Sequence, residues 1–171
     1  MKRLIKVIDM LALILYRISG LLLVMMMLSV VADVAARSLF AVTDGSVDLT
    51  FVGGIEVVKY GLLFAMLFAF PHAVDKGQIV VDLFTHKLPA SKLRWFDGFY
   101  TLCFGVFGAL LCWRFFEAAG ASAMSGELTQ DLLIPLAPMY LVSAVALAVL
   151  ALRGFSCGIR ELLGKKETVT S

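Results

Sequence analysis

Six charged residues lie inside or at the edges of long apolar segments, where ionisable groups are candidates for chemistry. They are Asp33, Arg37, Glu56, Lys59, Arg114 and Glu117. Such groups often mark an ion or proton pathway when a membrane surrounds them. Here they come as opposite charges three or four residues apart, a spacing at which two side chains meet on one helix face. The alternative is therefore a layer of paired charges that fixes helix register and docks a partner. The pairing favours this second hypothesis, because a proton relay more often leaves one carboxylate unpaired.

Two histidines and three cysteines are the other candidates for catalysis or metal binding. His72 and His86 lack the matched positions on facing helices that a haem requires. The cysteines form neither a C-x-x-C pair nor a zinc pattern. The sequence contains no Ser-His-Asp set, no Gly-rich phosphate loop and no H-E-x-x-H motif. We expect no catalytic, cofactor-binding or metal-binding residue in this chain, and no enzymatic activity.

The composition places these residues in a membrane protein. Hydrophobic residues make up 61% of the chain and charged residues 16%, against about 25% charged in ordinary soluble proteins. The apolar residues form four blocks, each near or above the roughly 20 residues that cross a bilayer. The sequence thus predicts an all-α membrane protein, a single domain over 1–171 with helices at about 4–36, 51–74, 93–119 and 132–155 and a polar tail at 156–171. The net charge of +2 and the absence of a basic tract argue against nucleic acid as a partner.

The first block is longer than a bilayer requires. A continuous helix of that length would reach about 50 Å, beyond a hydrocarbon core of about 30 Å. Lys6, Asp9 and Arg17 interrupt its apolar character near the start. Either the helix is strongly tilted, or its beginning lies along the cytoplasmic surface before the chain turns inward. The polar interruptions near that end favour the second arrangement. We also expect it to remain in the protein, since no small-residue cleavage site of a signal peptide follows it.

A short amphipathic helix is predicted at about 79–88, between the second and third spans. Polar residues there, including Gln78 and Asp82, share one helical face, and apolar residues, including Phe84, share the other. A helix of this kind is too short to span and lies in the plane of the membrane interface.

Small residues form a stripe along the third span, at alternating spacings of three and four. They are Gly98, Thr101, Gly105, Gly108 and Cys112. Such a stripe allows the backbone of a second helix to approach closely.

The distribution of lysine and arginine predicts the orientation. Eleven lie at the two chain ends and in the middle loop, and only Arg37 lies in the other two loops. By the positive-inside rule, both termini and the middle loop are cytoplasmic. The outer loops then carry four acidic residues, which are either plain solvated charges or a docking face for a periplasmic partner: Asp44, Asp48, Glu127 and Asp131.

Four motifs in this order resemble the small membrane subunit of tripartite ATP-independent periplasmic (TRAP) transporters. Arg37 is followed by an aromatic residue, and Glu56 lies in the first turns of the second helix. The run 76–82, Lys-Gly-Gln-Ile-Val-Val-Asp, is similar to the family signature, although Gln78 stands where the family has histidine. The run 134–140 is similar to the proline-containing start of its last helix.

The resemblance implies a chain that transports nothing by itself. In the family, a large membrane subunit holds the substrate and sodium sites, and a periplasmic substrate-binding protein delivers a carboxylate or related organic anion. The small subunit would be a scaffold in the bacterial inner membrane, surrounded by phospholipid, with no cofactor of its own. Arg37 and Glu56 would then serve assembly with the large subunit.

Three other functions remain as alternatives. A structural subunit of another membrane complex would share the same physical features. A self-sufficient proton-coupled carrier would require an unpaired carboxylate in the middle of the first helix, whereas Asp33 is expected near its outer end, beside Arg37. A four-helix thiol oxidase would require cysteine pairs in the outer loops, which contain none.

Overall fold

The computed structural model describes residues 2–46, 49, 52–74 and 90–163, and within them the fold is all-α. The helices are α1 (Lys2–Val42), α2 (Gly54–Ala73), α4 (Ala90–Ser125) and α5 (Leu136–Leu162). Among these described residues none belongs to a strand, and Leu128 and Pro135 form an isolated bridge. All four helices are long and apolar enough to cross a membrane, which confirms the four predicted spans. The interfacial helix predicted at 79–88 lies outside the described residues.

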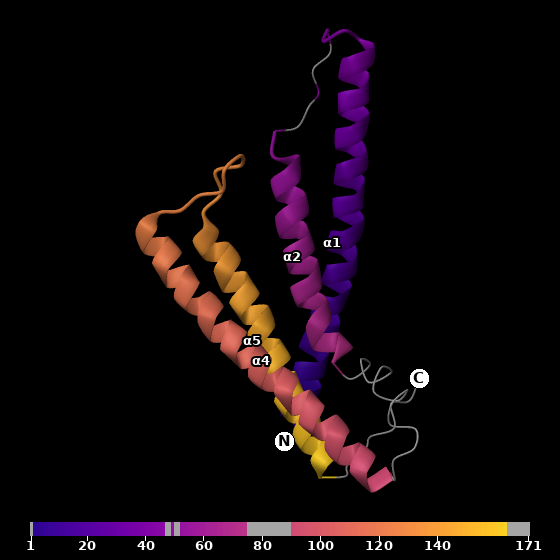
Figure 1. The fold of residues 1–171 in the computed structure, drawn as a ribbon, viewed down its shortest axis with the longest axis vertical. Helices are drawn as coiled ribbons and strands as arrows, with labels where there is room; N and C mark the ends of the chain where they lie inside the picture. The colour runs from indigo at the N-terminus through magenta and orange to yellow at the C-terminus, as the bar shows by residue number, and fades with distance from the viewer. Residues whose placement is uncertain (1, 47–48, 50–51, 75–89, 164–171) are drawn as a thin grey trace.

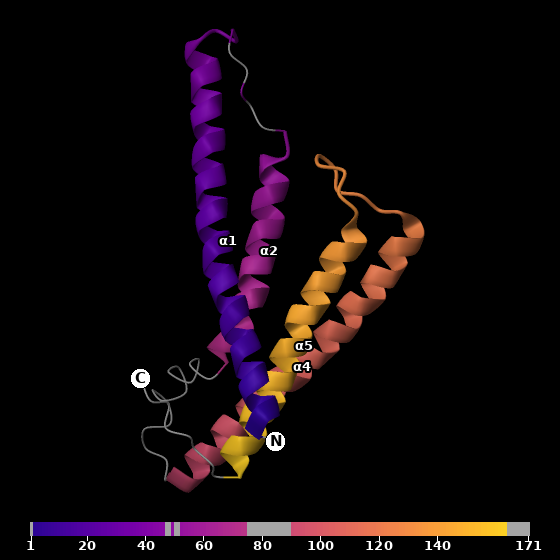
Figure 2. The ribbon, with the colours of Figure 1, turned by 180° about the vertical axis from the view of Figure 1, so that it is seen from behind.

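The helices form two antiparallel pairs that diverge from a common base (Figure 1). One pair is α1 with α2 and the other is α4 with α5, and Figure 2 shows the same separation from behind. The α1–α2 and α4–α5 connections lie at the open end, which we call the loop end. The N-terminus and the C-terminal end of α5 lie toward the opposite end, which we call the terminal end. Helix α5 contacts each of the other three helices.

Helix α1 is continuous over 41 residues, so the expected turn near its start is wrong. Lys6, Asp9 and Arg17 do not interrupt the helix: lysine and arginine have good helix propensity and long side chains that reach a polar environment, and the Asp9 carboxylate pairs with Arg153. The helix also extends to Val42 rather than to about 36, and an ion pair four residues apart supports this last part. It ends where Asp44 and Gly45 adopt positive φ angles of 48° and 82°.

The ends of α4 and α5 also differ from those predicted. Helix α4 continues past Ala119 to Ser125, where Ala121, Ala123 and Met124 favour a helix, and stops at Gly126, whose φ is +70°. Helix α5 begins only after Pro135, which is extended and restricts the residue before it. It continues to Leu162 because its final turns still pack against α4.

The α4–α5 pair is held by close backbone contact along a seam of glycines. A Cβ atom added to Gly105 would lie 2.9 Å from the amide nitrogen of Phe155, and one added to Gly154 would lie 2.7 Å from the Cα of Gly105. Gly108 faces the backbone of Ala151 in the same way, at 3.0 Å. The predicted stripe of small residues therefore lies against α5. Because lipid gives helices no hydrophobic drive to associate, such close van der Waals packing is a main source of their attraction.

Polar contacts support the same two helix pairs. Thr101, which is 2% exposed, donates hydrogen bonds to the backbone oxygen of Asp97 at 2.8 Å and to Glu161 at 3.2 Å. Between α1 and α2, the hydroxyl of Ser19 donates to the backbone oxygen of Ala65 at 2.7 Å.

A small apolar cluster joins α2, α4 and α5 along the half of α2 that leads to the terminal end. Its buried members are Leu67, Ala146, Leu147 and Leu150. Partly buried residues pack against it, including Leu63 of α2 and Leu111, Cys112 and Phe115 of α4.

The contacts between helices relate their heights: Gly108 of α4 lies against Ala151 of α5, and Arg153 of α5 binds the oxygen of Pro71 near the end of α2. At about 1.5 Å per residue, this register places Arg114 of α4 roughly level with the midpoint of Gly54–Ala73.

The seam predicts opposite effects for two alanine substitutions in the same helix. Gly105→Ala should destabilise the protein by about 1–3 kcal/mol, because the new methyl group forces α4 away from α5. Gly120→Ala, at a position with nothing within 4 Å of an added Cβ, should be neutral or stabilising by up to about 1 kcal/mol through helix propensity. Unfolding both variants in mixed detergent micelles, followed by circular dichroism, checks this. Equal effects would contradict the proposed role of the seam.

Candidate functional site

The loop end of α2 holds a buried carboxylate that binds the α4–α5 loop. Glu56, only 7% exposed, accepts hydrogen bonds through Oε1 from the amides of Gln130 at 2.6 Å and Asp131 at 3.0 Å. Its Oε2 accepts a third from the amide of Leu132 at 3.1 Å. Hydrogen bonds to an ionised acceptor are stronger than neutral ones. Glu56 therefore fastens this loop to α2.

The loop itself is shaped to present those three amides. Thr129 and Ile134 bind each other twice, once through the Thr129 amide at 2.9 Å and once through its hydroxyl at 3.1 Å. At the base, the Leu136 amide donates to the oxygen of Glu127 at 3.1 Å. The side chain of Leu132 packs onto Gly53, where an added Cβ would lie 2.7 Å from it. Gly53 also has a φ of +107°. Glycine is therefore favoured there both because a Cβ would clash with Leu132 and because other residues rarely adopt a positive φ.

The charge pairs predicted from spacing are formed in part. Asp33 and Arg37 form an ion pair at 2.9 Å on α1. Among the described residues, Glu56 and Lys59 form no ion pair, because the Glu56 carboxylate is bound by the loop amides. The ammonium of Lys59 lies instead 5.2 Å from the ring centroid of Tyr60.

Asp33 also lies beside the start of α2. A Cβ added to Gly54, the first residue of α2, would be 3.6 Å from the carboxyl carbon of Asp33. The first amides of a helix carry a partial positive charge, which a nearby carboxylate stabilises. Two carboxylates, Asp33 from α1 and Glu56 from the first turn, therefore meet the loop end of α2. Arg37, 61% exposed at its side chain, faces outward from this group.

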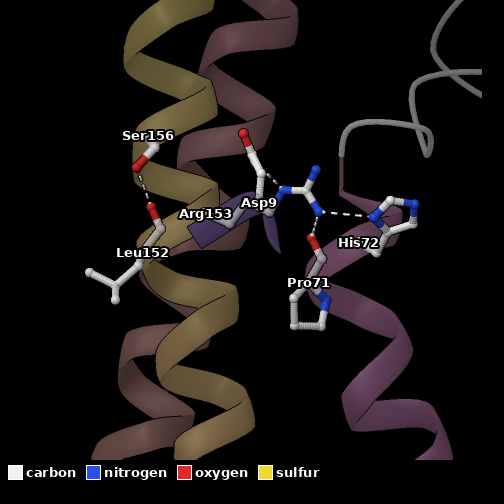
Figure 3. Close-up of polar contacts among 6 residues, drawn as sticks. All are labelled: Asp9, Pro71, His72, Leu152, Arg153 and Ser156. Carbon is white, nitrogen blue, oxygen red and sulfur yellow. Dashed lines mark hydrogen bonds and ion pairs between the residues drawn. The ribbon is translucent and has the colours of Figure 1, made fainter. Parts of the chain in front are cut away.

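A buried arginine at the terminal end joins three helices (Figure 3). Arg153 of α5 is 6% exposed. Its Nη1 donates to the backbone oxygen of Pro71 at 2.9 Å and lies 3.3 Å from Nδ1 of His72. Its Nε lies 3.4 Å from a carboxylate oxygen of Asp9 on α1. Because a guanidinium only donates, Nδ1 of His72 is the acceptor, which places the proton of the neutral ring on Nε2.

Arg153 satisfies a polar group that the end of α2 would otherwise leave unpaired. The oxygen of Pro71 is one of the last carbonyls of α2 and has no partner within the helix, and a cation is favoured at this end. Sequence reasoning missed this contact, because Arg153, near the end of the predicted fourth span, was counted among the cytoplasmic charges of the chain end. Two signals in the sequence were available: an arginine flanked by Leu152 and Gly154, and an acidic residue, Asp9, within the first apolar block.

The third predicted pair, Arg114 with Glu117, forms at 2.7 Å and points away from the other helices. The two side chains are 74% and 61% exposed. Both lie within about one turn of Phe115, which packs on the apolar cluster of α2, α4 and α5. Phe115 also meets the ring of Tyr140 at a centroid distance of 6.0 Å. Helix α4 continues past both charges to Ser125, so they lie farther from its end than the predicted end at about 119 implied.

The remaining predicted residues are placed as follows. Asp44, Glu127 and Asp131 are exposed in the connections at the loop end. Asp48, Gln78, Asp82 and Phe84 lie outside the described residues. In the described part of the chain, no group of three or more histidine, cysteine, aspartate or glutamate side chains could hold a metal ion.

The family model of the DctQ component of tripartite ATP-independent periplasmic transporters matches residues 26–163. This range contains α2, α4 and α5 and the second half of α1. Neither the curated proteins nor the solved structures yield a match to the chain.

Replacing Glu56 should release the α4–α5 loop without unfolding the bundle. In Glu56→Ala, the amides of 130–132 lose their acceptors, so their hydrogen exchange should accelerate by at least about tenfold. Hydrogen-exchange mass spectrometry on the chain in nanodiscs measures this directly. The control is Glu127→Ala, an exposed acid of the same loop, which should leave these amides protected. Unchanged exchange in Glu56→Ala would refute the anchoring role.

Replacing Arg153 should loosen the two helix pairs from each other. Arg153→Met leaves the oxygen of Pro71 unpaired in a buried setting and should destabilise the protein by about 1–3 kcal/mol. Arg153→Lys should recover only part of this, because one ammonium does not reproduce the separate contacts that Nη1 and Nε make. Arg17→Met, at an exposed position of α1, is the control. Unfolding in mixed micelles gives the ranking, and equal stability of all three variants would contradict it.

Proposed function

The chain belongs to the family of DctQ components of tripartite ATP-independent periplasmic transporters, and we propose that it scaffolds the large transport subunit of a sodium-coupled member. In this role it performs no chemistry. It holds the large subunit in the bilayer and helps to dock the substrate-binding protein for the uptake of an organic anion such as a carboxylate. Sodium and substrate are bound by the large subunit.

The observation that carries the proposal is the way this chain uses its buried charges. Glu56 and Arg153, the buried charged side chains of the described core, bind backbone groups and neighbouring helices. A carrier site requires polar groups that are available to a substrate or a moving proton. Here they are engaged at the two ends of α2, which supports a fixed frame rather than a transport path.

We further propose that the loop end faces the periplasm and the terminal end the cytoplasm of a bacterium, across its inner membrane. The support is the excess of lysine and arginine at the chain ends and in the middle loop. In this orientation, the loop anchored by Glu56 is presented to the substrate-binding protein. The exposed acids Asp44, Glu127 and Asp131 then belong to the docking face.

Phospholipid is the other partner that we propose. Besides the long apolar outer surfaces, a mostly apolar pocket of about 190 Å³ opens between α2, α4 and α5. It is lined by Phe70, Ala73, Val74, Tyr100, Phe104 and Leu150. Its lining suits hydrocarbon, and we assign it to a lipid chain near the cytoplasmic side.

Purification from native membranes tests the scaffold directly. The tagged chain, extracted in mild detergent, should bring with it a large polytopic membrane protein, and the substrate-binding protein should join when substrate is added. In proteoliposomes, anion uptake should require the large subunit and a sodium gradient, and the small chain alone should give none. Recovery of this chain only as a homodimer that carries protons would refute the proposal.

The polar residues at the loop end should affect assembly rather than chemistry. Arg37→Ala and Glu56→Ala should each reduce the amount of large subunit that co-purifies, because one removes an outward-facing cation and the other frees the docking loop. Arg17→Ala, near the opposite end of α1, is the control and should keep the wild-type amount. Normal assembly combined with loss of transport in both variants would show that their role is in the transport step instead.

A further inference from the structure

The outward face of α4 carries charges at a depth where lipid does not tolerate them well. Gly108 of α4 lies against Ala151 of α5, and Arg153 of α5 binds the oxygen of Pro71 of α2. At about 1.5 Å per residue, Arg114 is therefore roughly level with the midpoint of α2, and Glu117 lies about one turn closer to the loop end. Their side chains are largely exposed and point away from α5. Charged groups at the centre of a bilayer are costly, and in membrane proteins they almost always face protein or water-filled space.

Pairing with each other does not remove this cost. A guanidinium carries five N–H donors, and among the residues that the structure describes, Arg114 has one hydrogen-bond partner, Glu117. The remaining donors would have no acceptor in hydrocarbon, and each unsatisfied polar group there costs several kcal/mol. Snorkelling offers little relief, because it serves residues near helix ends. Arg17, also exposed on α1, is nearer to the terminal end, where its long side chain can reach the headgroups.

Large apolar side chains surround the pair and complete a surface suited to protein contact. Phe107, Leu110 and Trp113 are 53%, 63% and 74% exposed. With Arg114 and Glu117 they form what we call the Arg114 face, opposite the glycine seam that binds α5. Aromatic residues and arginine are enriched at protein interfaces and often dominate their binding energy.

We propose that the Arg114 face is covered in the membrane by a transmembrane segment of the large subunit, which presents a hydrogen-bond acceptor to Arg114. This inference rests on the proposed function and names the surface that performs it. The acceptor is a carboxylate, a hydroxyl or a free backbone carbonyl, since these are the groups that a guanidinium binds. The opposite face of α4 is already occupied by α5, so α4 lies between its own partner and the large subunit.

Two double variants test the charge contact in the complex. Arg114→Leu with Glu117→Leu should reduce co-purification of the large subunit by at least about tenfold, since truncating a buried charge contact is costly at an interface. The charge swap Arg114→Glu with Glu117→Arg preserves the pair but inverts its direction, so it should also reduce recovery. The isolated chain should unfold as wild type in both variants, because the pair contacts no other helix through an ion pair or hydrogen bond in the described structure. Wild-type recovery with both variants would overturn the proposal.

A photo-crosslinking amino acid in place of Leu110 identifies what covers the face. In native membranes that contain all transporter components, the expected product is an adduct with the large subunit. Adducts with phospholipid only, or with a second copy of this chain, would overturn the inference even when the large subunit co-purifies normally with the wild-type chain. If the wild-type chain recovers no large subunit at all, the proposed function itself fails, and the two failures are thus distinguished.

Discussion

The ends of α2 impose the constraint on which this arrangement depends. A membrane-spanning helix leaves amides at its start and carbonyls at its end without partners, and lipid supplies none. At the start, Asp33 of α1 lies beside Gly54, and Glu56 extends from the first turn to bind the α4–α5 loop. At the end, Arg153 of α5 binds the oxygen of Pro71. Asp33 holds α2 to its own pair, whereas Glu56 and Arg153 connect the two ends of α2 to the α4–α5 pair.

The pairs themselves are held by a different interaction. Along the α4–α5 seam, Gly105 and Gly154 bring the two backbones into direct contact. The van der Waals attraction over this surface does not depend on the hydrophobic effect, so it also acts within lipid. The pairs diverge from each other toward the loop end (Figure 1), so a seam of this kind cannot join them. Few but strong polar contacts can, since a charge-assisted hydrogen bond acts at a single point. The seam therefore builds each half of the frame, and Glu56 and Arg153 set the relation between the halves.

Hydropathy and spacing predicted the four long apolar helices, the stripe of small residues on α4 and two ion pairs, because these depend on residues within one helix. Helix ends were less predictable, since α4 continues from Ala119 to Ser125 although the hydropathy of the sequence falls there. The contact between Glu56 and Gln130 joins positions 74 residues apart, and no local pattern encodes it. Arg153 was misread for a related reason. An arginine at the edge of an apolar block looks the same whether it reaches solvent or turns inward to a carbonyl of another helix.

The charges of this chain thus divide into two groups by what surrounds them. Glu56 and Arg153 are buried, and their partners lie within the chain, which explains how a protein with so small a buried core keeps a defined shape. Arg114 and Glu117 are exposed at mid-height, and their setting is complete only when another protein is present. A protein that carried a substrate alone would have the reverse distribution, with available polar groups inside and an apolar exterior at this depth. The observed distribution is that of a component whose outer surface belongs to an assembly, and family membership names the assembly to which it belongs.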